Sequence, residues 1–354
     1  MDAAHCYLEG NADAVEFCPH EPYSNLLAAS TYTLQEGDSP SRSGSVYLFD
    51  VGDGEDVGLN LLQKIDTAGV FDIRWSRDND GGGNVSLAQA DADGCLRVYK
   101  IDDAEVKGNV FKIFKVLSFE TGYSLREVAG EKISSSMCLC LDWNQSSTSI
   151  VVGLSDGSAS VVSFTDSNLE TVQEWKGHDF EVWTATFDLN NANLVYTGSD
   201  DCKFSCWDIR DNPADNRVFQ NSKVHTMGVC CISPSPSDPY SIFTGSYDEM
   251  LRVWDTRSVT RPVNETSLSL GGGVWRIKHH PSLSGVVLAA CMHNGFAVAK
   301  VSDGKGEVLE SYNKHDSLAY GADWCRGKDQ KQSVVATCSF YDRLLRLWMP
   351  ENCI

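Results

Sequence analysis

Long apolar runs, a secretory leader and a metal-ligand cysteine pattern are all missing from this 354-residue chain. No apolar run approaches the roughly 20 residues that a bilayer-spanning helix needs. The opening residues, MDAAHCYLEG, lack the basic segment followed by an apolar segment that marks a secretory signal. We therefore expect a cytoplasmic protein that does not insert into membranes.

Positive charge is also scarce. The chain has 29 Lys and Arg residues against 49 Asp and Glu residues, a net charge of −20. Such a surface repels the phosphates of nucleic acids and anionic lipid headgroups. The charge therefore excludes nucleic acid as an expected partner, whereas a basic or cationic partner is compatible with it.

The 13 cysteines are an odd number and follow no disulfide framework. Several lie inside apolar runs, such as Cys138, Cys140 and Cys291, which is typical of reduced, buried thiols. Cys202 and Cys206 have no second pair at the spacing of a zinc site. We expect neither disulfides nor a bound metal.

Self-similarity is the strongest signal in the sequence. KGHDFEVWTATFDLNNANLVYTGSDDCKFSCWDIR and KVHTMGVCCISPSPSDPYSIFTGSYDEMLRVWDTR repeat with a period of 47 residues. His178 precedes Trp207 by 29 residues, and His225 precedes Trp254 by the same number. Four short apolar runs separated by tight turns, at a period in the forties, indicate blades of a WD-repeat propeller.

Weaker copies extend in both directions, so we predict an all-β, seven-bladed WD-repeat β-propeller that forms a single domain. The expected blades cover approximately residues 1–52, 53–101, 134–166, 172–211, 219–259, 266–303 and 311–350, with an insertion at 102–133.

The segment VGLSDGSASV contains a G-x-S-x-G pattern around Ser155, as in the nucleophile elbow of many esterases. On repeat alignment it coincides with the turns Gly198–Asp201 and Gly245–Asp248. A nucleophile elbow needs a helix after the serine, and SASVVSFTDS has no helical pattern. We predict that Ser155 lies in a β-hairpin turn.

The sixth repeat departs from the pattern. His293 replaces the turn aspartate and Cys291 replaces the serine, and two residues apart on a strand they would share a face. The pair could perform acid–base or nucleophilic chemistry, or this blade could simply have lost its polar network. Arg276, at a place held by Thr184 and Cys231 in regular repeats, could bind a carboxylate or an oxyanion, or pair with a structural Asp.

Aromatic residues recur five positions after the repeat histidine. Trp183, Trp275 and Tyr320 occupy this place, Phe71 matches it in the second repeat, and the regular fifth repeat has Cys230 there. Since these strand starts surround one mouth of the channel, the rings could bind a quaternary ammonium group. Ordinary packing between blades is the alternative.

From the fourth repeat onward the chain resembles one particular family. The motifs are GHDFEVW, VHTMGVC, TGSYDE, WDTR, GGVWRIKHHP, LAACMHNGF, YGADW and ATCSFYD, between residues 177 and 348. Together they are similar to the WD-repeat diphthine methyl ester hydrolases of eukaryotic diphthamide biosynthesis. Residues 1–140 support the fold and little else.

The resemblance implies hydrolysis of the methyl ester of methylated diphthine on elongation factor 2, which frees a carboxylate for the final amidation. The substrate side chain carries a trimethylammonium group and an ester. We expect His293 to act as general base for water or for Cys291, Arg276 to bind the oxyanion or carboxylate, and His225 to be a secondary candidate. No cofactor is expected.

A non-catalytic scaffold is the main alternative, because a propeller does not by itself imply chemistry. The sequences CWDIR and VWDTR contain Trp-Asp-x-Arg. That pattern resembles the motif by which WD proteins bind the cullin–RING ligase adaptor as substrate receptors, so this adaptor is a second candidate partner.

Overall fold

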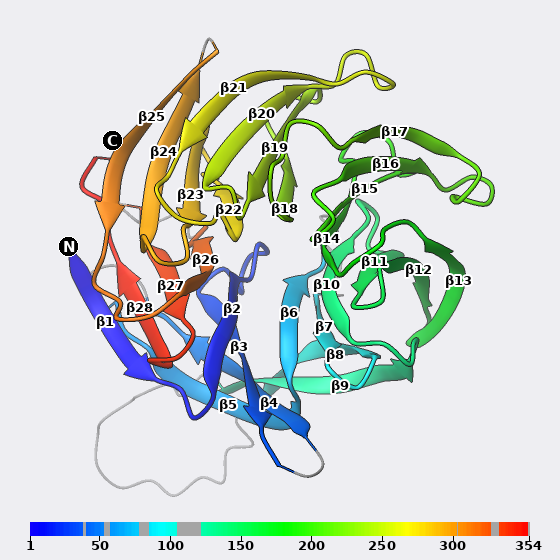
Figure 1. Ribbon diagram of the computed structural model, residues 1–354. Coiled ribbons are helices and arrows are strands. Elements are labelled where there is room, and N and C mark those ends of the chain that lie inside the picture. The colour runs from blue at the N-terminus through cyan, green and yellow to red at the C-terminus, as the bar shows by residue number, and fades with distance from the viewer. Residues whose placement is uncertain are drawn as a thin grey trace, which may run out of the picture.

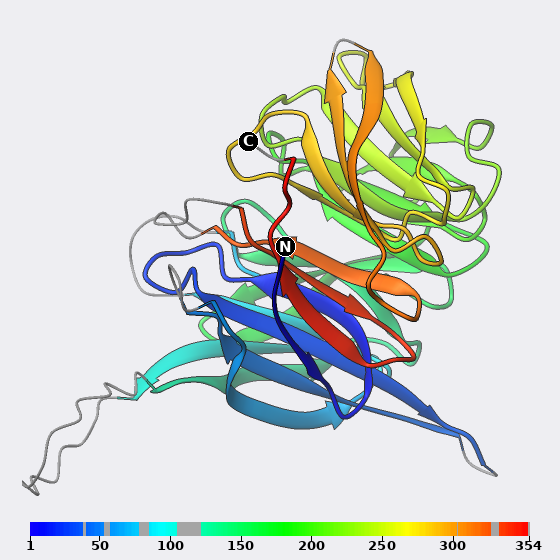
Figure 2. The ribbon, with the colours of Figure 1, turned by 90° about the vertical axis from the view of Figure 1, so that its left-hand side faces the viewer.

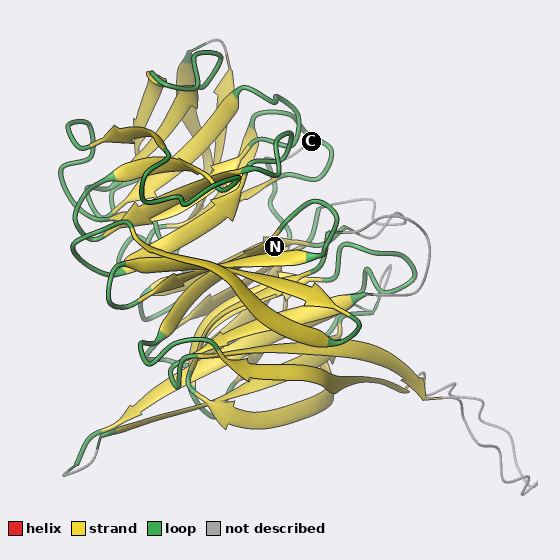
Figure 3. Ribbon diagram, turned by 90° about the vertical axis from the view of Figure 1, so that its right-hand side faces the viewer, coloured by secondary structure: helices red, strands yellow, loops and turns green. Residues whose placement is uncertain are grey.

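The computed structural model describes residues 1–37, 40–52, 57–77, 85–104, 122–302, 304–326 and 333–352. Within these ranges the regular elements are all β-strands, as the single strand colour in Figure 3 shows. No helix in the described ranges is long and apolar enough to cross a membrane.

The strands form seven four-stranded antiparallel sheets around a central axis (Figure 1), which confirms the seven-bladed β-propeller. From the axis outward, the first three sheets contain β2 (Asn11–Phe17), β3 (Leu26–Gln35), β4 (Ser41–Asp50) and β5 (Asn60–Ala68); β6 (Val70–Trp75), β7 (Ser86–Asp91), β8 (Cys95–Ala104) and β9 (Gly122–Lys132); and β10 (Cys138–Trp143), β11 (Ser149–Leu154), β12 (Ser158–Thr165) and β13 (Asn168–Lys176).

The next three sheets contain β14 (Val182–Phe187), β15 (Leu194–Ser199), β16 (Phe204–Asp208) and β17 (Arg217–Asn221); β18 (Val229–Pro234), β19 (Ser241–Ser246), β20 (Met250–Asp255) and β21 (Val263–Ser269); and β22 (Arg276–His279), β23 (Val286–Ala290), β24 (Phe296–Ser302) and β25 (Lys305–Tyr312). The seventh contains β26 (Ala319–Trp324), β27 (Val335–Ser339), β28 (Leu344–Trp348) and, outermost, β1 (Asp2–Tyr7).

The two ends of the chain close the ring. The dark-blue β1 pairs with the red β28 (Figure 2), with Tyr7 opposite Leu344. The first strand therefore belongs to the last sheet, not to a blade spanning 1–52, and residues 60–68 complete the first sheet. Because the N-terminal strand completes the C-terminal sheet, backbone hydrogen bonds join the two ends of the chain. β28 therefore has a strand on both sides and is not an open sheet edge.

The segment 102–133, expected as an insertion, is partly regular structure. β8 continues to Ala104, and β9 is the outer strand of the second sheet, paired with β8 from Gly122 to Lys132. Residues 105–121 lie outside the described residues. The repeat pattern missed β9 because an outer strand is half exposed and carries a weak apolar signal.

Apolar side chains fill the spaces between neighbouring sheets. One cluster packs Phe17 and Leu27 of the first sheet against Ala336 and Leu345 of the seventh, which seals the ring. Nine of the twelve described cysteines are buried, and all twelve are free thiols, as expected. Burial of this kind contributes roughly 25 cal/mol per Å² of apolar surface.

Buried polar networks stabilise the regular blades. The His178 ring binds Asp201 through Nδ1 at 3.0 Å and Thr197 Oγ1 through Nε2 at 2.7 Å. The Trp207 indole N–H donates to the same threonine oxygen at 2.7 Å. Ser199 donates separately to the Phe180 carbonyl oxygen at 3.1 Å, so the threonine joins the histidine to the tryptophan.

Ser155 lies in the turn between β11 and β12, as predicted. Its Oγ accepts the Met137 N–H at 3.0 Å, and Gly157 supplies the positive φ of 89° that closes the turn. A strand follows this serine instead of a helix, so the G-x-S-x-G pattern is a hairpin and not a nucleophile elbow.

Candidate active site

The central channel holds a cavity of about 650 Å³ lined by residues of all seven inner strands or the residues next to them. The inner strands are β2, β6, β10, β14, β18, β22 and β26, and they stand around the axis in Figure 1. Since ligands usually bind in concave cavities where apolar or aromatic side chains surround a few convergent polar groups, this channel is the candidate site.

A register shift near the start of six inner strands directs one side chain into the channel mouth. In β6, for example, Val70 and Asp72 pair with β7 while Phe71 between them is left out of the ladder. Bulges of this kind re-aim a side chain away from regular alternation. The equivalent residues, with Trp275 just before β22, form the mouth ring: Asp13, Phe71, Leu139, Trp183, Cys230, Trp275 and Tyr320.

Three of the four predicted aromatic residues, Phe71, Trp183 and Trp275, line the cavity, and Tyr320 joins them through its contact with Trp275. The Trp275 ring stacks on Tyr320 with centroids 4.8 Å apart and contacts Trp183 at 5.5 Å. Phe71 stacks on Tyr32 at 4.8 Å. Phe340 bridges the two groups, with centroids 5.1 Å from Tyr320 and 5.7 Å from Tyr32. All four predicted rings are half-buried, so each keeps some accessible surface.

Sequence reasoning missed two members of the mouth ring. Asp13 in NADAVEF stands where Phe71 stands in GVFDIRW, and Leu139 takes this place in MCLCLDW. Alignment of the inner strands puts both residues at the same position as Phe71. They do not belong to the aromatic recurrence because one is an aspartate and the other a leucine. Tyr32 and Phe340 were not predictable in this way, because they come from other strands or turns.

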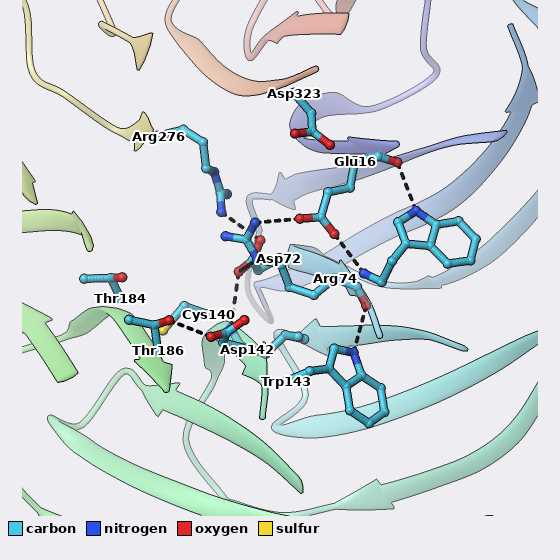
Figure 4. A network of polar contacts seen from close by, with 12 residues as sticks. Glu16, Asp72, Arg74, Cys140, Asp142, Trp143, Thr184, Thr186, Arg276 and Asp323 are labelled. Atoms are coloured by element: carbon cyan, nitrogen blue, oxygen red, sulfur yellow. Dashed lines mark hydrogen bonds and ion pairs between the residues drawn. The ribbon is translucent and has the colours of Figure 1, made fainter. Parts of the chain in front are cut away.

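Deeper in the channel lies a belt of paired charges, much of it drawn in Figure 4. Arg276 binds Asp72 with Nη1 3.0 Å from Oδ1, and Arg74 binds Glu16 at 2.7 Å. Arg77 binds both oxygens of another carboxylate, at 2.7 and 2.8 Å. The belt consists of Glu16, Asp72, Arg74, Arg77, Asp142, Arg276, Lys278 and Asp323.

The belt carboxylates also accept backbone N–H groups from neighbouring blades. Glu16 accepts from Trp75 at 2.8 Å, and Asp323 accepts from Phe17 at 2.8 Å. Burial alone would raise the pKa of Glu16, but the Lys278 and Arg74 cations lower it to about 2. The belt therefore holds the blades together as well as lining the cavity.

Arg276 connects the belt to the mouth ring. It follows Trp275 directly, lines the cavity, and its side chain is 13% exposed. In the described part of the chain, Asp72 is the one side chain bonded to this guanidinium. A guanidinium has five N–H donors, so Arg276 keeps donor capacity for a carbonyl or carboxylate oxygen in the channel.

The predicted His293–Cys291 pair does not form on a shared strand face. β23 ends at Ala290, and residues 291–295 form a turn in which the Cys291 N–H donates to the Gly295 carbonyl oxygen at 2.7 Å. Cys291 is fully buried and burial raises the pKa of its thiol to about 12, whereas His293 is exposed. The turn replaces the strand because it must reverse the chain into β24, and it points the two side chains differently.

Neither residue of that pair lines the channel cavity. His293 nevertheless lies close to the mouth in the chain: the carbonyl oxygen of the preceding Met292 accepts the Ala319 N–H at 3.0 Å, next to Tyr320 of the mouth ring. The backbone of this turn therefore lies beside the mouth ring, and the His293 side chain is exposed to solvent.

His225 is a core residue of the fifth blade. Its Nδ1 accepts from Arg252 at 3.1 Å, its Nε2 lies 3.2 Å from Thr244 Oγ1, and it does not line the channel. Burial and the Arg252 cation lower its pKa to about 4. Arg252 lies between His225 and the turn aspartate Asp248 and is bonded to both. We assign His225 to the blade network.

Comparisons with known proteins identify the repeat type and the protein family of this chain. A model of the WD domain, G-beta repeat, matches residues 169–208 and 217–255. A diphthine methyltransferase homologue of Dictyostelium discoideum is 31% identical over 379 residues, which cover 97% of this chain and 98% of that protein. The chain belongs to the diphthine methyltransferase family. The diphthine methyltransferase of Homo sapiens is 33% identical over 348 residues, covering 89% of this chain and 73% of the human protein.

A solved structure supports the architecture of this family member. A chain in a crystal structure of the Mitotic Checkpoint Complex matches with a TM-score of 0.70 and 15% identity, covering 99% of this chain and 91% of that one. At this identity the likeness concerns the propeller fold alone.

The names of the relatives refine the resemblance seen in the sequence. They confirm a family concerned with diphthine, but they name a methyltransferase and not a methyl ester hydrolase. Membership in the diphthine methyltransferase family is therefore established for this chain.

Proposed function

We propose that this protein hydrolyses the methyl ester of methylated diphthine on elongation factor 2 and thereby supplies diphthine for the final amidation step of diphthamide biosynthesis. The observation that carries the proposal is the direct succession of Trp275, in the aromatic mouth ring, and Arg276, in the channel below it. A substrate with a trimethylammonium group and an ester on one side chain needs these two kinds of site next to each other.

The mouth ring would bind the cation. Trimethylammonium groups are attracted to aromatic faces, with roughly 0.5–2 kcal/mol per contact. Trp275 and Tyr320 offer stacked, half-buried rings, and Trp183 adds a third at 5.5 Å from Trp275. The net charge of −20 attracts such a substrate over longer distances.

Arg276 would stabilise the developing negative charge. As a water oxygen bonds to the ester carbonyl carbon, the carbonyl oxygen becomes an oxyanion, and a guanidinium N–H can donate to it. The tetrahedral intermediate then collapses by breaking the bond to the methoxy oxygen, which leaves with a proton as methanol. The product is a carboxylate, and water is the one co-reactant, so the scheme uses no cofactor.

His293 is the proposed general base. The residue is exposed, and the backbone of the preceding Met292 is bonded to Ala319, the neighbour of Tyr320 in the chain. In the proposed scheme the His293 imidazole takes the proton of the attacking water and returns it to the leaving methoxy group. Cys291 has no role in this scheme, because a fully buried thiol with a pKa of about 12 is not available as nucleophile.

One assay separates the two directions of methyl chemistry. Purified protein is mixed with elongation factor 2 that carries methylated diphthine, and methanol and the mass of the modified peptide are followed. Hydrolysis predicts methanol release and a peptide lighter by one methylene. If the peptide instead gains a methyl group from S-adenosylmethionine, and no methanol appears, the hydrolase proposal is wrong and the name of the relatives describes this chain.

A substrate receptor of a cullin–RING ligase is the second candidate function. It is favoured by the two Trp-Asp-x-Arg sequences, whose arginines Arg210 and Arg257 are each 69% exposed and paired with Asp208 and Asp255. Co-purification with the ligase adaptor that is lost in the R210A/R257A variant, together with no ester turnover by the wild-type protein, would support the receptor function instead.

A further inference from the structure

Asp13 is the one charged member of the mouth ring. It lies at the bulge of β2, between Ala12 and Ala14, which both pair with β3. Its side chain lines the channel cavity although the residue is only 4% exposed. No hydrogen bond or ion pair connects its carboxyl group to another described residue. Each carboxylate of the belt, in contrast, is paired with a Lys or Arg side chain.

A mostly buried carboxylate without a hydrogen-bond donor is costly, because the little water that reaches it restores only part of its lost hydration. Burial raises the pKa of Asp13 to about 8; the Arg276 cation opposes this rise and the Asp72 charge adds to it. Asp13 is also close enough to Tyr320 and Tyr247 to add, after burial, to the increase in the pKa of both phenols.

We propose that Asp13 is the anionic partner of a quaternary ammonium ligand held in the mouth ring. The identity of that ligand, the trimethylammonium group of methylated diphthine, rests on the proposed function. A quaternary ammonium has no N–H donor, so it requires no matching set of acceptors. Aromatic faces and one carboxylate suffice for it, and these are what the mouth offers.

A metal ion or a primary amine fits this place less well. The described residues contain no group of three or more His, Cys, Asp or Glu side chains arranged to hold a metal ion. A primary ammonium needs several hydrogen-bond acceptors, whereas the neighbours of Asp13 in the ring are aromatic and apolar.

Binding of the cation should release a proton at neutral pH. An approaching positive charge favours the ionised carboxylate, so the pKa of Asp13 falls on binding. Affinity should therefore rise between pH 7 and 9. The titratable or charged groups that act on Asp13, or on which its charge acts, are Asp72, Tyr247, Arg276, Tyr320 and Cys338. The phenols and the thiol have raised pKa values and stay neutral in this range.

The test compares choline with its neutral isostere 3,3-dimethylbutan-1-ol, by tryptophan fluorescence and by calorimetry in buffers of different ionisation enthalpy. We expect the wild-type protein to bind choline more tightly than the isostere and to release a proton on binding. In the D13N variant we expect choline affinity to fall about tenfold or more, isostere affinity to stay unchanged, and proton release to disappear. D211N, which removes an exposed carboxylate outside the channel, is the matched control for net charge.

The melting temperature shows whether D13N acts through folding. Because the pKa of Asp13 is higher in the folded than in the unfolded protein, its ionisation destabilises the fold as the pH rises toward 8. D13N should therefore raise the melting temperature at pH 8 while it weakens choline binding. A purely structural aspartate would show the opposite, a lower melting temperature.

Equal choline affinity in wild type and D13N would overturn the inference, as would a wild-type protein that prefers the neutral isostere or binds neither probe. These readouts are independent of ester turnover. Choline binding that depends on Asp13, in a protein that hydrolyses no ester, leaves the inference standing and removes the proposed function. Normal ester turnover with an unchanged KM in D13N removes the inference and leaves the proposed function standing.

Discussion

The mouth ring draws on all seven inner strands and the charged belt on five of them, β2, β6, β10, β22 and β26, yet the two are built on opposite principles. In the belt, Glu16 is bonded to two cations and a backbone N–H. In the mouth ring, Asp13 has no partner among the described residues and the aromatic rings stay half-exposed. The charges of the belt have their partners within the protein. The Asp13 carboxyl group and the exposed ring faces of the mouth are available to a ligand.

This difference separates stability from function within one channel. Charges that are paired and hydrogen-bonded across blades hold the propeller closed, and local inconsistency is concentrated at the mouth, where a ligand would remove it. Arg276 belongs to both regions, because it is paired with Asp72 and lies directly below the aromatic rings.

The largest effect is expected from E16A in the belt. The variant leaves Arg74 and Lys278 buried without their shared carboxylate and removes the acceptor for the Trp75 N–H. We expect the free energy of unfolding in urea to fall by about 3–5 kcal/mol. E170A, at an exposed position of β13, should change it by less than about 0.5 kcal/mol. An E16A protein as stable as wild type would show that the belt does not hold the blades together.

Arg276 tests the junction of belt and mouth. R276M combined with D72N removes both partners of one pair, so that no buried charge is left alone. We expect kcat for the methyl ester to fall by about 10²–10³, the usual loss when an oxyanion donor is removed, with a smaller change in KM. The matched control is R252M/D248N, a buried pair of the fifth blade outside the channel. Retention of kcat in folded R276M/D72N would remove Arg276 from the mechanism.

The aromatic members of the mouth should affect binding more than chemistry. In W275A and Y320A, loss of a cation–π contact should raise KM roughly 2- to 30-fold while kcat changes little. Y7A, which removes a ring that is 69% exposed on the outer strand β1, should leave both constants unchanged. If KM is unaltered in both mouth variants, the cation is bound elsewhere.

The smallest effect is expected at Ser155. S155A removes the hydroxyl that accepts the Met137 N–H, which should lower the free energy of unfolding by about 1 kcal/mol. The turnover of the methyl ester should stay within about twofold of wild type. A large loss of kcat at unchanged stability would revive the nucleophile that the repeat alignment rejected.

Much of the fold was readable in advance. The 47-residue period, the recurring histidine and tryptophan, and the turn residues predicted seven blades and the hairpin at Ser155. The outer strand β9 and the pairing of β1 with β28 were not predictable in the same way. Outer strands carry few buried residues, and ring closure pairs segments more than 300 residues apart in the sequence.

For the site, the sequence alone determined which residue types recur at each strand start, because repeats place equivalent positions at equivalent depths in the channel. Trp183, Trp275 and Tyr320 could therefore be assigned to one mouth. The pairing of Arg276 with Asp72, 204 residues away, and the lack of a bonded partner for Asp13 among the described residues follow from the three-dimensional packing. Pairing and burial depend on which side chains of different blades meet across the axis, and no local pattern in the chain encodes that.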